Sequence, residues 1–155
     1  MPTELQLLRH ADAEVHAATD LERPLSEKGR RQAAEVARFL SEHPTVPELI
    51  LTSTALRTVQ TAEIIGKALQ VDCVPCPWAL PGMGVEEALY ELKAYGRLKR
   101  VMLVGHQPDL GELIAFLLGM PQAVRVHVRK ASLAQLTLIG AQAARLEAFV
   151  PCKLM

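Results

Sequence analysis

Short apolar runs alternate with amphipathic stretches along this chain, and each pattern predicts one kind of element. Four runs are apolar with little alternation, and polar residues, glycine or proline bound them. Runs of this length are typical of strands that are buried on both faces of a sheet. They occupy residues 5–8, 49–52, 71–74 and 100–104. Two later segments, near residues 123–128 and 133–138, alternate more and are expected to form strands toward a sheet edge.

Helices are predicted between the strands, where apolar residues recur every three or four positions. The first helix begins after Ser26, a good N-cap, and ends before Pro44. The second takes Ser53 or Thr54 as its N-cap and runs to about Leu69. Two more helices are expected over residues 85–95 and 110–118.

Strands that alternate with helices form βαβ units, whose strands are parallel and whose helices cover the sheet. The predicted fold class is therefore α/β, with three α/β/α layers, a mostly parallel central sheet and the C-terminal strands toward its edge. At 155 residues the chain has the length of one domain, and no repeat or linker divides it. We expect a single domain over residues 1–155.

Composition and charge exclude several classes of protein. The 17 basic residues balance 17 acidic ones, so the chain lacks the positive charge of a general nucleic-acid binder. Half of the residues are apolar, which argues against disorder. No stretch resembles a bilayer-spanning or secretory segment, so no membrane partner is expected. Three cysteines, an odd number, favour a reducing compartment, and we expect a cytoplasmic protein.

Polar residues follow three of the predicted strands directly. Arg9 and His10 come after the first strand, Arg57 lies in the turn after the second, and His106 follows the strand over residues 100–104. Ligands of parallel α/β sheets bind at the carboxyl ends of the strands, so we expect these four side chains to meet there. Helix N-termini open at the same edge and favour an anion.

Two imidazoles and two guanidinium groups suit the transfer of a phosphoryl group. Arginine binds phosphate oxygens through paired hydrogen bonds and stays charged. A neutral imidazole is a competent nucleophile toward phosphorus, and a protonated one can stabilise charge on the phosphoryl oxygens. We expect the arginines to lower the pKa of the attacking imidazole, and a bound phosphate to raise the pKa of its partner.

Three motifs resemble those of the histidine phosphatase superfamily, and they occur in that family's order. They are Leu8-Arg9-His10-Ala11, the Ser-x-x-x-Arg-x-x-x-Thr-Ala segment from Ser53 to Ala62, and Val104-Gly105-His106-Gln107-Pro108. Within the superfamily the chain is most similar to the small bacterial phosphohistidine phosphatases of the SixA type. The segments that carry this second likeness are residues 9–13, 20–29 and 151–155.

The resemblance implies a phosphoglycerate mutase-like fold and a role for each matching residue. His10 becomes the nucleophile that accepts phosphate, and Arg9, Arg57 and His106 form the pocket that holds the phosphoryl group. Arg23 adds to this pocket, orients its loop or serves as a salt-bridge partner. The family needs no metal and no cofactor, and the arginines near His10 would repel a cation.

Two departures from the family pattern bear on the reaction. Ala11 stands where the superfamily most often has glycine, and we expect local adjustment because alanine is the smallest alternative. Larger members also carry a carboxylic acid after the third strand, whereas this chain has none there before Glu86 and Glu87. An alcohol leaving group depends on such a proton donor more than an imidazole does. The chain is therefore expected to prefer phosphohistidine.

Three functions remain open from the sequence. The leading one is metal-independent hydrolysis of phosphohistidine on a phosphorelay or phosphocarrier protein, through phospho-His10. The second is hydrolysis of a small phosphomonoester, with Asp12, Glu86 or Glu87 as the general acid. The third is a phosphate-binding module without turnover. The expected partner is thus a phosphohistidine-containing protein; the sequence does not decide the oligomeric state, and a monomer is the working expectation.

Overall fold

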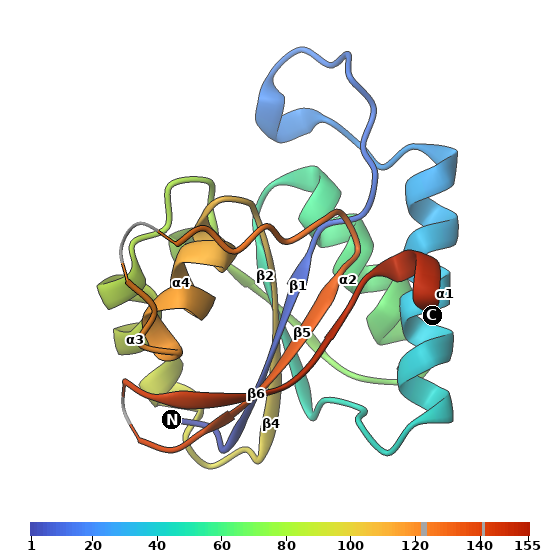
Figure 1. The fold of residues 1–155 in the computed structure, drawn as a ribbon. Helices are drawn as coiled ribbons and strands as arrows, with labels where there is room; N and C mark the ends of the chain where they lie inside the picture. Colours follow the sequence, from blue (N-terminus) through green and yellow to red (C-terminus); the bar gives the residue numbers. More distant parts are fainter. Residues whose placement is uncertain (122–123, 141) are drawn as a thin grey trace.

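The structure is a computed structural model that describes residues 1–121, 124–140 and 142–155. Its helices and strands follow the predicted alternation, with short 3-10 turns between them (Figure 1). The strands are β1 Glu4–Arg9, β2 Leu49–Ser53, β3 Cys73–Cys76, β4 Arg100–Gly105, β5 Leu133–Leu138 and β6 Ala144–Val150. The helices are α1 Glu27–Glu42, α2 Leu56–Leu69, α3 Val85–Leu92 and α4 Asp109–Leu117, and the 3-10 turns are η1 Asp20–Glu22, η2 Pro77–Ala79, η3 Lys93–Tyr95 and η4 Cys152–Leu154.

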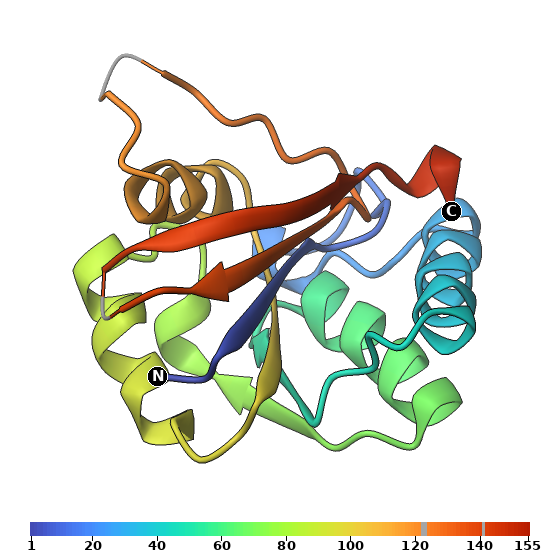
Figure 2. The ribbon, with the colours of Figure 1, turned by 60° about the horizontal axis from the view of Figure 1, so that its bottom comes forward.

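One six-stranded sheet in the order β3-β2-β4-β1-β5-β6 forms the centre of the molecule. The first four strands in this order are parallel, whereas β5 and β6 are antiparallel to their neighbours. Helices α1 and α2 cover one face, and α3 and α4 cover the other (Figure 2). The prediction of a three-layer, mostly parallel α/β fold with C-terminal strands toward the edge is confirmed.

The lack of polar alternation in the strands has a packing cause. Along β1, Leu5 and Leu7 pack with α3 and α4, whereas Leu8 packs with α1 and α2. Both faces of the inner strands are therefore in contact with helices, and burying each leucine contributes about 2 kcal/mol. An alternating strand would place polar side chains in one of these two cores.

Parallel register brings the carboxyl ends of β1, β4 and β2 to the same edge of the sheet. Arg9 lies opposite Gly105 in the β1–β4 pair, and Thr52 lies opposite Val104 in the β2–β4 pair. The backbone N–H of His10 extends the first pairing by donating to the carbonyl of Gly105, with 3.0 Å between nitrogen and oxygen. The residues that follow these strands are thus neighbours in space.

The predicted strand near residues 123–128 is wrong over residues 124–128, and residue 123 lies outside the described residues. Both edges of β1 are already paired, with β4 and with β5. The backbone of Val126 and Val128 instead bonds to the side chain of Gln107, and the carbonyl of Val128 also accepts from Arg9. The sixth strand is β6, which the sequence analysis missed.

The two predicted N-caps differ in outcome. Ser26 caps α1, since its Oγ accepts the backbone N–H of Gly29 at 3.1 Å. The prediction of Ser53 or Thr54 as the cap of α2 is wrong, because Ala55 occupies that position without a side-chain hydrogen bond. Ser53 Oγ bonds to His106 instead. Within the described residues, no helix is both long enough and apolar enough to cross a membrane.

Glycine is required where α1 meets the segment after β1. A Cβ atom on Gly29 would lie 1.9 Å from the backbone carbonyl oxygen of Asp12. We expect Gly29→Ala to lower the free energy of unfolding by about 1–3 kcal/mol, because backbone must move to relieve the clash. Gly140→Ala is the control, since nothing lies within 4 Å of its added Cβ. Denaturant unfolding checks both variants, and equal stability of the two would contradict the close approach.

Candidate active site

Two histidines from distant parts of the chain lie together at the carboxyl edge of the sheet. The ring centroids of His10 and His106 are 5.4 Å apart, with a tilt of 55° between the planes. Arg57 lies beside them, with its Nη2 atom 3.5 Å from Nδ1 of His106. All three are buried, with exposed fractions of 3–6%. The structure therefore brings the two predicted imidazoles and one predicted guanidinium into a common cluster.

The hydrogen bond of His10 determines which ring nitrogen is free. Its Nδ1 atom lies 2.8 Å from the carbonyl oxygen of Ala11. A carbonyl only accepts, so Nδ1 carries the proton and the lone pair of the neutral ring is on Nε2. The nitrogen that keeps its lone pair is the one suited to nucleophilic attack.

His106 has the opposite arrangement. Its Nε2 atom lies 2.8 Å from Ser53 Oγ, and its Nδ1 atom faces the guanidinium of Arg57. Arginine has no acceptor, so Nδ1 carries the lone pair and Nε2 donates to Ser53. Ser53 Oγ also accepts the N–H of Ala55 and is thereby fixed. Nδ1 of His106 is therefore the atom that can take up a proton inside the cluster.

Burial keeps both imidazoles neutral in this structure. The pKa of His10 is lowered to about 4, mainly by burial and also by the charges of Arg57, Arg9 and Lys130, against the hydrogen bond to Ala11. Burial also lowers the pKa of His106 to about 3, assisted by the charges of His10 and Arg57. The pKa of His10 is thus lowered, as the sequence analysis expects, but burial rather than the charge of the arginines is the larger cause.

Asp20 holds Arg57 in place from the loop that precedes α1. Arg57 Nη1 donates to the carbonyl oxygen of Asp20 at 2.6 Å, and Nη2 lies 3.0 Å from its carboxylate. The Asp20 side chain is 60% exposed, whereas that of Arg57 is 6% exposed. A buried cation is costly without a partner, so this carboxylate stabilises the buried guanidinium.

Arg9 and Arg23 occupy different environments. Arg9 is half-buried; its Nη1 donates to the carbonyl of Val128, and its Nε is buried without a hydrogen-bond partner among the described residues. Arg23 donates to the carbonyl of Glu14 and to the carboxylate of Asp20. Of the roles considered for Arg23, these contacts fit salt-bridge partner and loop orientation, because Arg23 reaches the cluster only through Asp20.

Comparisons with known proteins agree with this geometry. A sequence model of the histidine phosphatase superfamily (branch 1) matches residues 5–77. The phosphohistidine phosphatase SixA of Escherichia coli (strain K12) is 29% identical over 117 residues, which cover 70% of each chain. A solved structure of an Agrobacterium tumefaciens protein assigned to SixA is 30% identical, with a TM-score of 0.83, and the match covers 97% of this chain and 99% of that one.

This chain belongs to the histidine phosphatase superfamily.

Two further solved structures share the fold of this chain at lower sequence identity. The protein histidine phosphatase SixA complexed with tungstate has a TM-score of 0.88 at 25% identity, and the match covers 97% of both chains. The alpha-ribazole phosphatase from Shigella flexneri has a TM-score of 0.76 at 20% identity, with 96% of both chains covered, and shows the fold alone. Membership in the superfamily supports a phosphatase, while the fold is shared by enzymes with different substrates.

The three candidate acids are either paired with a cation, as Asp12 is, or exposed, as Glu86 and Glu87 are. The carboxylate of Asp12 bonds to Lys130 at 2.7 Å and to Ser26 at 2.7 Å, and the hydrogen bond from Lys130 is the main reason why the pKa of Asp12 is lowered. Glu86 and Glu87 are exposed in the first turn of α3. In the described part of the chain, neither glutamate makes a hydrogen bond or ion pair with His10 or His106.

Ala11 is compatible with the site despite the family's usual glycine. Its backbone lies outside the left-handed region, and its side chain is fully buried. Its N–H donates to Thr61 Oγ1 at 3.1 Å, and Thr61 in turn donates to the carbonyl of Arg57. The position after His10 therefore needs a small residue rather than glycine's conformational freedom.

Sequence reasoning did not assign roles to several residues that position the site. These are Ser53, Thr61, Asp20, Lys130 and Asp109. Asp109 is buried and accepts the N–H of Gly82, so it ties the start of α4 to the loop before α3. Ser53 and Thr61 fall within the second motif, which could have marked them, whereas nothing local marks Asp20 or Lys130 as a partner of a distant residue.

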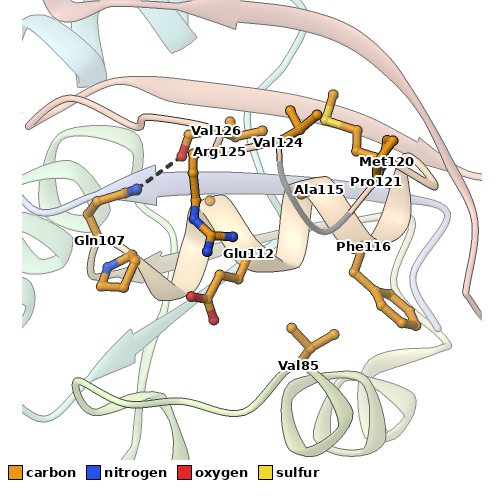
Figure 3. A pocket seen from close by; sticks show the side chains of 12 residues that line it. Val85, Gln107, Glu112, Ala115, Phe116, Met120, Pro121, Val124, Arg125 and Val126 are labelled. Carbon is orange, nitrogen blue, oxygen red and sulfur yellow. Dashed lines mark hydrogen bonds between the residues drawn. The ribbon is translucent and has the colours of Figure 1, made fainter.

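Two hollows lie next to the histidine phosphatase site, on either side of the segment over residues 124–132. A cavity of about 480 Å³ lies between α4 and this segment, beyond Gln107 and Pro108 (Figure 3). Gln107 donates to the carbonyl of Val126 across it, and the side chains of Arg125 and Glu112 point toward one another (Figure 3). The second hollow, of about 560 Å³, includes Arg9 and Asp12.

Metal ligands are not gathered in the part of the chain that the structure describes. There, no group of three His, Cys, Asp or Glu side chains is placed to hold an ion.

Two of the cysteines, Cys73 and Cys76, lie in β3, and burial raises the pKa of both thiols.

The two buried histidines predict a stability that falls with acid. Their pKa values of about 4 and 3 lie below the usual 6.5, so the unfolded chain binds more protons between pH 6.5 and these values. The free energy of unfolding is therefore unaffected by them above pH 6.5 and decreases below it, by about 2 kcal/mol per histidine at pH 5.

Denaturant unfolding at pH 7 and pH 5 measures this loss. His106→Gln removes one of the two groups, so we expect its stability to fall by about 2 kcal/mol less than that of the wild type over this range. An identical pH dependence of the two proteins would contradict the lowered pKa of His106.

Asp20 already pairs with Arg57, so we expect this carboxylate to compete with any phosphate that binds the guanidinium. We expect Asp20→Asn to lower the inhibition constant of inorganic phosphate by about two- to five-fold, because one exposed carboxylate no longer pairs with the guanidinium. Glu22→Gln is the matched control, since Glu22 lies in the same 3-10 turn and bonds to Thr19. Competitive inhibition of hydrolysis measures both, and weaker inhibition in Asp20→Asn would show that the carboxylate assists phosphate binding.

Proposed function

We propose that this chain is a metal-independent phosphohistidine phosphatase that acts on a phosphorylated protein through a phospho-His10 intermediate. The observation that carries the proposal is the pair of neutral imidazoles with opposite tautomers beside Arg57. His10 offers Nε2 as a nucleophile, and His106 offers Nδ1 as a proton acceptor within the same cluster. Residues 1–155 form the single domain that performs the reaction.

In the first step, Nε2 of His10 attacks phosphorus, and the bond between phosphorus and the substrate's imidazole nitrogen breaks. The electron pair of that bond leaves with the nitrogen, and the substrate's imidazole departs as a neutral group because its other ring nitrogen has already taken a proton from solvent. Arg9 and Arg57 bind the phosphoryl oxygens, and the negative charge favours protonation of His106, which can then donate to an oxygen. In the second step, water attacks phospho-His10, and phosphate and neutral His10 are released.

The placement of the carboxylates favours a nitrogen leaving group. Asp12 is held ionised by Lys130, so it is a poor proton donor. An alkoxide leaving group gains about 10²–10⁴-fold from a positioned donor, whereas a protonated imidazole leaves without one. The names of the SixA relatives point to the same substrate class. A cytoplasmic phosphorelay or phosphocarrier protein is the partner that fits this chemistry.

The proposed intermediate is tested by rapid quench with a labelled phosphohistidine protein. We expect an acid-labile label on His10, no label in His10→Ala, and unchanged labelling in His43→Ala, whose exposed imidazole lies at the end of α1. Arg57→Ala should lower capture of phosphate by about 10- to 100-fold, because charge-assisted hydrogen bonds are lost. Full labelling of His10→Ala would overturn the assignment of the nucleophile.

The substrate class is tested by side-by-side kinetics. We expect a higher kcat/KM for phosphohistidine on a protein than for sugar monophosphates. The reverse order would favour the small phosphomonoesterase instead, and binding of phosphate without turnover of either substrate would favour a binding module.

A further inference from the structure

A groove lined by basic side chains lies close to the candidate active site, with Arg9 in its wall. It is the hollow of about 560 Å³ introduced above, and we call it the basic groove. Its wall comes from three parts of the chain: the end of β1 with the start of α1, the segment before β5, and η4. The lining residues that carry or can carry positive charge are Arg9, Lys28, His127, Arg129, Lys130 and Lys153.

The charge of the basic groove is unbalanced. Asp12 is the one carboxylate among its lining residues, and this carboxylate is already paired with Lys130. Among the described residues, no carboxylate forms an ion pair with Lys28, Arg129 or Lys153, and all three side chains are exposed. The whole chain has a formal charge of zero, so this is a local excess and not a general property of the surface.

The basic groove lies beside the catalytic cluster, although His10, His106 and Arg57 are not among its lining residues. Arg9 and Asp12, which lie on either side of His10 in the sequence, are both part of its lining. The charge of Lys130 is close enough to act on the imidazole of His10. A macromolecule whose phosphohistidine lies against His10 would therefore present part of its neighbouring surface to this groove.

Two buried polar atoms of the lining lack partners within the described structure. They are Arg9 Nε and the hydroxyl oxygen of Ser132, and Ser132 is 1% exposed. Buried polar atoms are nearly always hydrogen-bonded in folded proteins, to protein, water or ligand. Because both atoms are buried, they belong to the inner wall of the groove and are not contacts for a docked partner.

We propose that the basic groove docks an acidic surface patch next to the phosphohistidine of the substrate protein. The inference rests on the proposed function and adds to it the feature that selects a protein substrate. Carboxylates of the partner would pair with Lys28, Arg129 and Lys153, in a position fixed by the phosphohistidine at His10. Complementary charge of this kind speeds encounter and selects among partners.

The probes are two synthetic peptides that each carry one phosphohistidine, one flanked by glutamates and the other by glutamines at the same positions. Free phosphohistidine is the third probe. At low salt we expect the glutamate peptide to have a roughly 5- to 50-fold higher kcat/KM than the glutamine peptide, through KM rather than kcat. At about 0.5 M salt the advantage should largely disappear, because exposed charges are screened.

The test variant combines Lys28→Glu, Arg129→Glu and Lys153→Glu. It should lose the preference for the glutamate peptide and keep the wild-type kcat/KM on free phosphohistidine, because the substituted residues lie outside the catalytic cluster. The matched control combines Lys67→Glu, Lys93→Glu and Arg97→Glu, which changes the net charge equally at exposed sites outside the groove. The control should keep the preference.

The outcomes separate the two proposals. Equal kcat/KM for the two peptides in the wild type would overturn the docking proposal without any variant, whether or not the triple variant folds. An equal loss of the preference in the control would also overturn it, since the effect would then follow net charge. Failure to hydrolyse any phosphohistidine probe, with good activity on a sugar phosphate, would overturn the proposed function itself.

Discussion

The parallel pairing of β1, β4 and β2 is the constraint on which the site depends. Because Arg9 lies opposite Gly105, the residues that follow these two strands emerge side by side, and His10 meets His106 across 96 positions of sequence. The pairing is stabilised by apolar side chains on both faces of the sheet, in two separate cores. Hydrophobic burial far from the chemistry therefore fixes the distance between two catalytic candidates.

The same burial sets the chemical state of the site. Removing imidazoles from water favours their neutral form, and the nearby guanidinium groups act in the same direction. A neutral pair is unfavourable for stability in acid, yet it leaves a lone pair on Nε2 of His10 and on Nδ1 of His106. The carboxylate of Asp20 supplies the negative charge beside the buried guanidinium of Arg57.

The sequence predicted what depends on local pattern and on general rules of topology. The buried strands, the Ser26 cap and the meeting of His10 with His106 all follow from apolar spacing and the carboxyl-edge rule. The predictions that failed concern segments whose structure depends on contacts with residues distant in the sequence. Residues 124–128 alternate like a strand, but β1 has no free edge, whereas β6 is largely exposed and pairs with β5. Asp20 is paired with Arg57 only because the loop before α1 folds back over α2.

The segment over residues 124–132 forms no strand, but it contacts the residues around His10. Ala131 has a φ of 53°, which is unfavourable for alanine, and its N–H is shared between the carbonyls of Arg9 and His10. Strain of this kind persists only where surrounding contacts fix it. Here Arg9 donates to the carbonyl of Val128, and Lys130 pairs with Asp12. The segment therefore bonds to residues that precede and follow His10 in the sequence. The strand end that carries His10 and the basic groove beside it are therefore built from the same contacts.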